Sequence, residues 1–373
     1  MTWPMILAAL CALCLAHLVR APKAGRRAVA PAAFVIGLVV AAIGVRTSAD
    51  LFQIKRPDAY DGFLAHATAS AKTEPQAPIL LFVGTSYTRN ALDDERLTES
   101  LRRAGLPHLA INYSLEGASY QERFLRLSDL LKALPRAPDA VFLEVADKYD
   151  LRPAYAFKVG KLSNRSIGQF GPASAGWTAL GISQGACPGL KDCALDLAYL
   201  GVHTGLNALN VGLLSVARPI GGGEPAGSFD PVTTVRTPVP IAEREAGLLA
   251  RPLLNRTAGP TWARSYRRLK ATLLQDAGVT RVGYYLPPVI SDAKRSYVSG
   301  LCAGELADAP CIAPDDPALL ARLNADVWFD AEHLLAPGAE IYTDWLAERL
   351  IHFLVDTPPR AGVDVAEAEA ARP

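Results

Sequence analysis

PILLFVGTSYTRNALDDERLTESLRRAG, at residues 78–105, carries the signals of a buried strand, a tight turn and a helix. The run from Pro78 to Gly84 is short, apolar and ended by glycine, as expected for a strand covered on both faces. The following DDERLTESLRRAG has acids in its first turn, bases in its last turn and Gly105 as a stop. This arrangement complements the helix dipole and predicts a helix.

Strands and helices continue to alternate along the chain. Short apolar runs predict strands, and longer runs with mixed polarity predict helices. The strands are expected at 108–115, 139–146 and 281–286, and the helices at 119–134, 262–278 and 338–354. Because such alternation is typical of a parallel sheet covered on both faces, we predict an α/β domain with three α/β/α layers over residues 78–356.

The alternation stops between residues 150 and 260, which are rich in glycine and proline. We predict an insertion over one end of the sheet. Ligands of open α/β sheets bind beyond the carboxyl ends of the strands, so the insertion is placed to form a wall or lid of the site. The alternative is an irregular segment that makes no contact with the site. Residues 49–77 are expected to form a membrane-proximal arm, and residues 357–373 a disordered tail.

The N-terminus has the features of a membrane anchor. Apolar runs at 2–19 and 29–45 are close to the roughly 17–25 residues that a spanning helix needs. The intervening RAPKAGRR, at 20–27, is strongly basic, and such loops stay in the cytoplasm. We predict two spans within residues 1–48 and an extracytoplasmic domain after them. A single span, or a cleaved signal peptide, is the alternative.

The overall charge gives no sign of a nucleic-acid partner. The 38 Lys and Arg residues nearly balance the 37 Asp and Glu residues, which leaves a formal charge of +1. A protein that binds nucleic acid usually carries a basic patch or a clear basic excess. Half of the residues are apolar, which also excludes disorder as the main state.

Four cysteines occur as two close pairs, Cys187 with Cys193 and Cys302 with Cys311. Outside the cytoplasm, where conditions are oxidising, such pairs predict two short-loop disulfides. Four reduced and buried thiols are the alternative. No spacing of cysteine and histidine suggests zinc, so no metal site is predicted.

Three residues suggest nucleophilic catalysis. Ser86 follows the first strand, which places its hydroxyl at the rim of the sheet, although a helix N-cap is an alternative role. Asp330 and His333 are three residues apart, close enough for the carboxylate to orient the imidazole. The other ring nitrogen is then available to accept the proton of the serine hydroxyl, which makes the serine a better nucleophile. The alternative for His333 is an ordinary loop histidine.

Three motifs resemble those of the SGNH, or GDSL-like, hydrolase superfamily. They are GTSYTRN after the first strand, INYSLEGASYQE after the second, and DAEHLLAPGA before the last helix. The resemblance covers residues 79–149 and 261–354. It implies that Ser86 is the nucleophile and that the backbone N–H groups of Ser86 and Gly117 bind the oxyanion. It also implies that His333 is the general base and acid, oriented by Asp330.

The chain departs from the family pattern at two places. Thr85 stands where many members have aspartate, in a position that supports the turn. In the third block the chain has LEVADKYD, at 143–150, and so lacks the asparagine that donates to the oxyanion. Arg89 or Asn90, one turn beyond the serine, is the candidate replacement. The structural alternative pairs Arg89 with a surface acid and makes Asn90 a turn residue.

The acids of the LEVADKYD segment, Glu144, Asp147 and Asp150, suggest at first a metal or paired-carboxylate site. One short segment at the rim provides no ligand set, so we interpret them as solvated loop acids. Aromatic residues such as Tyr284 and Tyr285 are candidates for stacking on sugar rings, with packing in the core as the default.

The membrane-anchored form of these motifs is similar to the proteins that partner membrane-bound O-acyltransferases. The resemblance implies O-acetylation of an exported or cell-surface polysaccharide through an acyl-serine, at the periplasmic face of a bacterial inner membrane. The acyl group would come from the membrane-bound partner, with no diffusible cofactor. An esterase or deacetylase acting on glycan or lipid esters is one alternative. A catalytically inactive, polysaccharide-binding scaffold subunit is another.

Overall fold

The computed structural model describes four long segments and several short ones. The segments are 61–115, 120–145, 270–304 and 306–356, with residues 37, 179–180, 183, 191, 194, 198, 229–230 and 232–233. The chain divides into two units. All the elements described below belong to the unit formed by residues 60–156, 181–190 and 223–373.

Five parallel strands form one sheet in the order β2-β1-β3-β4-β5. They are β1 (Ile79–Gly84), β2 (Leu109–Ser114), β3 (Ala140–Glu144), β4 (Arg281–Tyr285) and β5 (Cys311–Ile312). The predicted α/β class with a parallel sheet is therefore confirmed. Because β2 and β3 lie on opposite sides of β1, the connections diverge there, and ligands of open sheets bind beyond the carboxyl ends of the strands at such a point.

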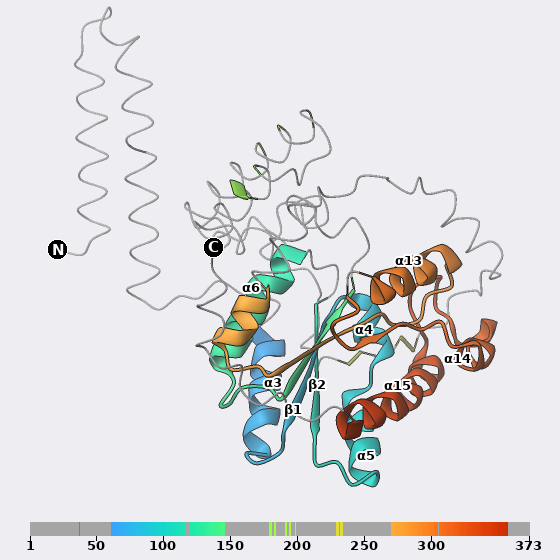
Figure 1. Ribbon diagram of the computed structural model, residues 1–373, viewed down its shortest axis with the longest axis horizontal. Helices are drawn as coiled ribbons and strands as arrows, with labels where there is room; N and C mark the ends of the chain where they lie inside the picture. The colour runs from blue at the N-terminus through green and yellow to red at the C-terminus, as the bar shows by residue number, and fades with distance from the viewer. Residues whose placement is uncertain are drawn as a thin grey trace, which may run out of the picture. The chain divides into compact units, whose positions relative to one another are not determined.

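Side chains alternate between the two faces of the central strand. Leu80 and Phe82 face one hydrophobic cluster, whereas Ile79, Leu81 and Val83 face another. Helices α5 (Asp94–Arg103) and α15 (Ala336–Asp356) contribute to the first cluster, and α3 (Asp61–Thr73) and α6 (Tyr120–Ala133) to the second (Figure 1). Both faces are thus covered, and this burial excludes water from the whole of β1.

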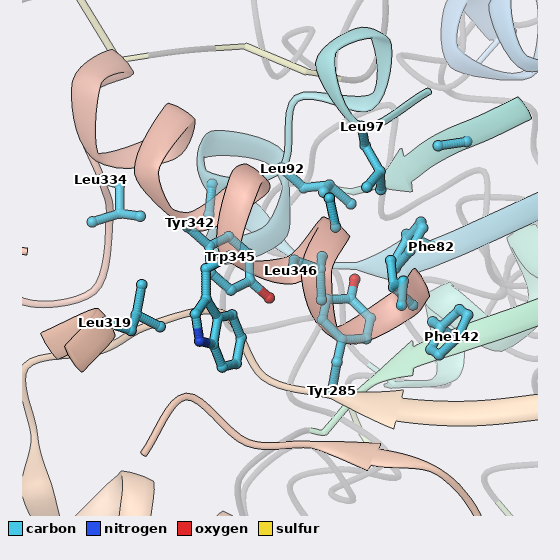
Figure 2. Close-up of a cluster of buried hydrophobic side chains, with 14 of the residues drawn as sticks. Phe82, Leu92, Leu97, Phe142, Tyr285, Leu319, Leu334, Tyr342, Trp345 and Leu346 are labelled. Atoms are coloured by element: carbon cyan, nitrogen blue, oxygen red, sulfur yellow. The ribbon is translucent and has the colours of Figure 1, made fainter. Parts of the chain in front are cut away.

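Leucines and aromatic rings make up most of the cluster on the α15 side (Figure 2). Phe82 and Phe142 stack with their ring centroids 5.1 Å apart, and Tyr285 meets Phe82 edge-on at 5.5 Å. From α15, Tyr342 and Trp345 pack against the same cluster. Each such ring stabilises the fold by about 1.5–3 kcal/mol through burial, so these contacts hold β1, β3, β4 and α15 together.

Helix α3 belongs to the α/β domain, which therefore begins before residue 78. Phe63, Ala67 and Ala71 are buried in the cluster that covers the second face of the sheet. The sequence predicted a membrane-proximal arm over residues 49–77 because this segment is polar and contains Pro57 and Pro75. Close packing of small side chains, rather than a broad apolar stripe, holds the helix on the sheet.

Four further helical elements complete the labelled set in the described residues. They are α4 (Ser86–Ala91), α13 (Asp292–Ala303), α14 (Pro317–Arg322) and the 3-10 turn η3 (Ala325–Val327). The helix predicted at 262–278 is described from residue 270 and continues to 276. Helix α4 follows β1 directly, so it lies at the carboxyl end of the sheet.

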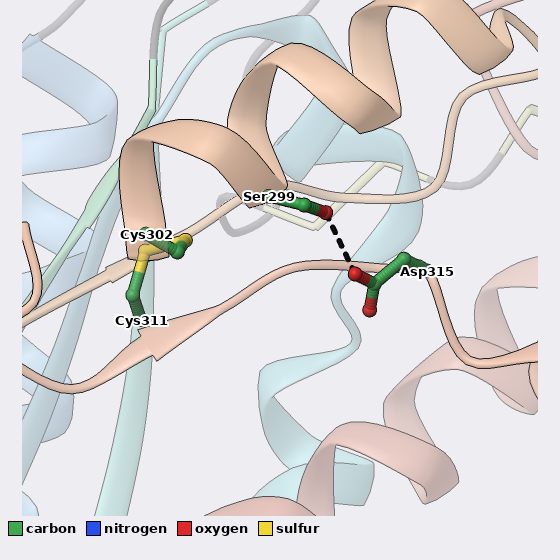
Figure 3. Close-up of a disulfide and its surroundings, with 4 residues drawn as sticks. All are labelled: Ser299, Cys302, Cys311 and Asp315. Atoms are coloured by element: carbon green, nitrogen blue, oxygen red, sulfur yellow. Dashed lines mark hydrogen bonds between the residues drawn. A yellow bond between two sulfur atoms is a disulfide. The ribbon is translucent and has the colours of Figure 1, made fainter. Parts of the chain in front are cut away.

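The predicted disulfide between Cys302 and Cys311 is confirmed (Figure 3). It joins the end of α13 to β5, with the two Cα atoms 5.4 Å apart. Beside it, the Ser299 hydroxyl of α13 donates to the Asp315 carboxylate at 2.7 Å. The other predicted pair, Cys187 and Cys193, lies outside the described residues.

Several predicted segments also lie outside the described residues. These are the spans 2–19 and 29–45 except for Gly37, most of the insertion 150–260, and the tail 357–373. In the part of the chain that the structure describes, no helix combines the length and the apolar character needed to span a bilayer.

Candidate active site

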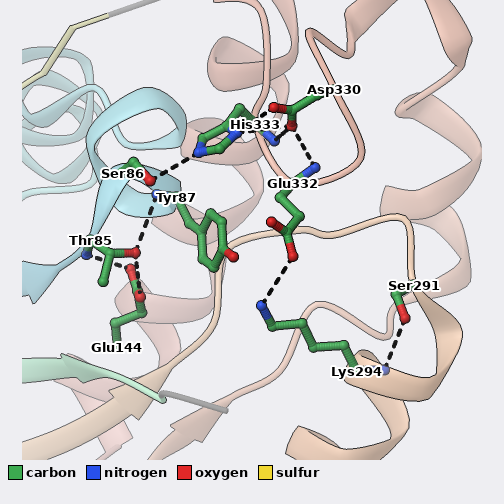
Figure 4. Close-up of polar contacts among 9 residues, drawn as sticks. All are labelled: Thr85, Ser86, Tyr87, Glu144, Ser291, Lys294, Asp330, Glu332 and His333. Carbon is green, nitrogen blue, oxygen red and sulfur yellow. Dashed lines mark hydrogen bonds and ion pairs between the residues drawn. The ribbon is translucent and has the colours of Figure 1, made fainter. Parts of the chain in front are cut away.

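Ser86, His333 and Asp330 come together at the carboxyl end of β1 (Figure 4). The Ser86 hydroxyl oxygen lies 2.9 Å from Nε2 of His333. The other ring nitrogen, Nδ1, lies 2.8 Å from both carboxylate oxygens of Asp330. An imidazole held between a hydroxyl and a carboxylate in this way can accept the hydroxyl proton while the carboxylate stabilises its positive form.

Asp330 also shapes the loop that carries the histidine. Its Oδ1 accepts hydrogen bonds from the backbone N–H groups of Glu332 and His333, each at 2.8 Å. The loop is closed by the Phe329 N–H, which donates to the carbonyl of His333 at 3.0 Å. Burial favours a higher pKa for Asp330, but the hydrogen bonds and the charge of the imidazole outweigh it, so the pKa is lowered. The carboxylate therefore stays ionised beside the ring.

The nucleophile turn, residues 84–88, leads from β1 into α4. Thr85 is the N-cap, and its hydroxyl accepts the Tyr87 N–H at 3.4 Å, so the alternative role considered for Ser86 belongs to its neighbour. Gly84 has no room for a side chain, because a Cβ atom would collide with Thr88 and with the Glu144 carboxylate. Among the described residues, no acceptor binds the Ser86 N–H. Since no competing hydrogen bond occupies it, the Ser86 N–H is available to donate to a negatively charged oxygen formed at the serine.

Glu144, the last residue of β3, lies directly beneath this turn. Its Oε2 accepts from the Thr85 N–H at 2.8 Å and from the Thr88 hydroxyl at 2.6 Å, and its Oε1 accepts from the Thr85 hydroxyl at 2.7 Å. The Tyr285 hydroxyl lies 2.8 Å from the Thr88 hydroxyl, and the Arg123 guanidinium lies 3.8 Å from Glu144.

The prediction that Glu144 is a solvated loop acid is wrong, because its side chain is only 2% exposed. Asp147 and Asp150 lie outside the described residues. Tyr285 is fully buried, so its default role in the core is the one observed. The sequence feature that could have indicated the burial of Glu144 is its position at the end of a strand that is buried on both faces.

The two candidate side-chain donors to the oxyanion, Arg89 and Asn90, bind Asp230 instead. Arg89 Nη2 lies 2.6 Å from the Asp230 carboxylate, and Asn90 Nδ2 donates to the Asp230 carbonyl at 2.6 Å. The interpretation of Arg89 as the partner of a surface acid is therefore the one that the structure supports. Among the described residues, neither side chain forms a hydrogen bond with Ser86, and Gly117, the other candidate donor, lies outside the described residues.

Part of the predicted insertion contacts the candidate site through Asp230, which binds Arg89 and Asn90. Besides the contacts of Asp230, the backbone of Val232 forms a parallel bridge with Leu335, and its carbonyl accepts the Ala336 N–H at 3.3 Å. Residues from the insertion therefore contact both α4 and the segment just after His333. These contacts favour the prediction that the insertion forms a wall of the site over the alternative that it makes no contact with the site.

A further group of side chains lines the rim beside the imidazole (Figure 4). The ring centroids of Tyr87 and His333 are 5.3 Å apart, and the Lys294 ammonium lies 4.3 Å from the centroid of Tyr87. Lys294 also lies 3.6 Å from the carboxylate of Glu332. These contacts hold the tyrosine ring against the histidine loop.

Comparisons of the chain with protein-family models, curated proteins and solved structures gave no match. Within the described segments, no cluster of three or more His, Cys, Asp or Glu side chains is arranged to hold a metal ion.

Proposed function

We propose that this protein is a serine acyl-transfer enzyme in which Ser86 is the nucleophile. The supporting observation is the continuous line from the Ser86 hydroxyl through His333 to Asp330, with contacts of 2.9 Å and 2.8 Å. Hydrogen-bond distance between a nucleophile and its base, with a third group orienting the base, is the signature of this chemistry.

In the proposed first step, the Ser86 oxygen attacks the carbonyl carbon of an ester as its proton passes to Nε2 of His333. Asp330 stabilises the imidazolium, and the Ser86 N–H donates to the oxyanion of the tetrahedral intermediate. The intermediate collapses, and His333 returns the proton to the leaving alcohol, which leaves an acyl-serine. In the second step, His333 removes a proton from an acceptor hydroxyl, which attacks the acyl-serine. His333 then returns that proton to the departing Ser86 oxygen, which leaves the acylated acceptor and the free enzyme.

The more specific assignment rests on the sequence. The three motifs that resemble the SGNH superfamily include both segments that form the site, and we propose that the domain is a member. We further propose that the acceptor is a hydroxyl of an exported or cell-surface polysaccharide, and that the acyl group is acetyl. The enzyme would be anchored in a bacterial inner membrane with its site in the periplasm. A membrane-bound O-acyltransferase would supply the acyl group.

Hydrolysis is the second candidate, because water and a sugar hydroxyl compete for the same acyl-serine. The same site then acts as an esterase or deacetylase on glycan or lipid esters. A third candidate is an inactive polysaccharide-binding scaffold. The observation that favours it is the capture of Arg89 and Asn90 by Asp230. Loss of a single oxyanion donor lowers turnover by about 10²–10³-fold in other enzymes.

Labelling with a fluorophosphonate probe tests whether the serine is reactive. We expect the full-length protein to be labelled on Ser86, and the variants Ser86→Ala and His333→Ala to lose labelling. Ser299→Ala, which removes a hydroxyl on α13, is the matched control and should label like the wild type. An unlabelled wild-type protein with its Cys302–Cys311 disulfide intact would contradict the proposal and favour the scaffold.

Transfer and hydrolysis are separated by supplying an activated acetyl ester with and without an oligosaccharide. Transfer predicts acetylated sugar in the presence of the acceptor. Free acetate as the sole product, at an unchanged rate, would identify the protein as an esterase.

A further inference from the structure

Glu144 is a buried carboxylate that the proposed reaction does not use directly, yet three of its hydrogen bonds go to the nucleophile turn. We propose that Glu144 is a positioning residue that holds the turn so that Ser86 meets His333 and its N–H faces the reacting carbonyl. This inference rests on the proposed acyl-transfer function and adds to it. These contacts reach residues on both sides of Ser86 in the turn, Thr85 directly before it and Thr88 two positions after it.

The hydrogens in this network have one consistent arrangement. A carboxylate accepts only, so Thr85 and Thr88 must each donate their hydroxyl hydrogen to Glu144. Thr88 then has no hydrogen left, so the Tyr285 hydroxyl is the donor in the contact between them at 2.8 Å. Burial raises the pKa of Tyr285, and the charge of Glu144 raises it further, so this hydroxyl keeps its proton. Every hydroxyl rotor around the carboxylate is therefore fixed.

The charges in the network are also shielded from water. The side chains of Glu144 and Arg123 are 2% and 8% exposed, and the guanidinium Nη1 lies 3.8 Å from the carboxylate. A buried charge without compensation is strongly unfavourable, and here the nearby guanidinium and the three hydrogen bonds from the turn stabilise the buried carboxylate. The nucleophile turn is thus tied to β3 through Glu144, to β4 through Tyr285 and to α6 through Arg123.

Small movements of this turn matter for the reaction. The Ser86 hydroxyl and His333 come from segments 247 residues apart, so their 2.9 Å contact depends on how each is held. A misplacement of 1 Å in an active site can lower the rate about 10²-fold. Gly84 shows how little space the turn has, because a Cβ atom there would lie 2.6 Å from Glu144 Oε2.

The sharpest test replaces one oxygen of this carboxylate without changing its shape. In Glu144→Gln, the amide can accept from the Thr85 N–H and from Thr88, but its NH₂ group then faces the Thr85 hydroxyl that formerly donated to Oε1. We expect the rate constant for fluorophosphonate labelling, and kcat for an activated acetyl ester, to fall by about 10–100-fold. KM should change less than threefold, because the residue does not touch the substrate.

The matched control is Glu340→Gln, which removes a carboxylate that pairs with Arg96 on the exposed side of α15. It should label at the wild-type rate. A second pair of variants tests the same network from the other end. Thr88→Val keeps the volume but removes the hydroxyl and should be slow, whereas Thr88→Ser keeps the hydroxyl and should recover most of the rate. Recovery by serine separates positioning from a role in packing.

All rates are compared at a temperature at which circular dichroism shows each variant folded. Wild-type labelling rates in folded Glu144→Gln would overturn the inference and leave the proposed function intact. If that variant does not fold, equal rates in Thr88→Val and Thr88→Ser would overturn it. If the wild-type protein itself is not labelled, the proposed function fails and this inference fails with it.

Discussion

Asp94 provides a stability test that follows directly from its surroundings. It is the first residue of α5, and its Oδ2 accepts the Asn112 N–H at 2.9 Å. The Asn112 amide in turn donates to the carbonyls of Leu92 and Thr88 at 2.7 Å and 3.3 Å, next to the nucleophile turn. Burial raises the pKa of Asp94 from 3.8 to about 6, against the lowering effect of its backbone hydrogen bonds.

The sign of the pH effect follows from proton binding. Between pH 3.8 and about 6, the folded state keeps the Asp94 proton, whereas the unfolded chain has lost it. Folding therefore takes up a proton in this window, and the free energy of unfolding decreases as the pH rises through it. A difference of about 2.2 pH units corresponds to about 3 kcal/mol, since each unit is worth about 1.36 kcal/mol.

The variant Asp94→Asn removes this titration, while its amide oxygen can still accept the Asn112 N–H. As the pH rises from 4 to 7, we expect the free energy of unfolding of the variant to increase by about 3 kcal/mol relative to that of the wild type. Urea unfolding of the full-length protein, followed by the fluorescence of the buried Trp328 and Trp345, measures both curves. Parallel curves for the two proteins across that range would refute the reasoning, because another group would then carry the pH dependence.

Three further predictions concern other parts of the domain. Asp330→Asn should leave the melting temperature nearly unchanged but slow fluorophosphonate labelling on the order of 10³–10⁴-fold, because the amide favours the wrong imidazole tautomer; a loss under tenfold would argue against the assigned role. Gly283→Ala should destabilise the domain by about 1–3 kcal/mol in urea, because its Cβ atom would lie 2.5 Å from the Phe142 ring; an unchanged midpoint would contradict this packing. Replacing Cys302 and Cys311 together by serine should remove about 2–3 kcal/mol of stability through loss of the cross-link, and the difference from wild type should vanish in reducing agent.

The strands at the centre of the sheet were predictable because they are buried on both faces. Such strands are apolar at nearly every position, as in residues 79–84, and no polar alternation is needed to find them. Helix α3 was not predictable in the same way, because it packs through Phe63 and alanines, which carry a weak apolar signal. Strand β5 has two residues and is defined by its pairing with β4, so it has no apolar run of its own that the sequence could reveal.

Local spacing also explains which residues of the candidate site could be predicted to lie together. Asp330 and His333 are close in the chain, so their contact needs only one tight loop, and Ser86 is placed by the strand before it. The role of Glu144 depends on how β3 pairs with β1, which the sequence does not contain. Likewise, the partner of Arg89 is Asp230, which lies in a distant segment of the chain, so no local sequence pattern predicts this ion pair.

The central claim is that His333 and Asp330 make the Ser86 hydroxyl nucleophilic. Its most direct measurement is the trapping of the acyl-enzyme: the full-length protein is mixed with 4-nitrophenyl acetate, quenched in acid within the first turnover, digested and examined by mass spectrometry. We predict an acetyl group on Ser86 in the wild type and its loss in His333→Ala. Acetylation that is absent from Ser86, or that persists at the same rate without the imidazole, would contradict the mechanism.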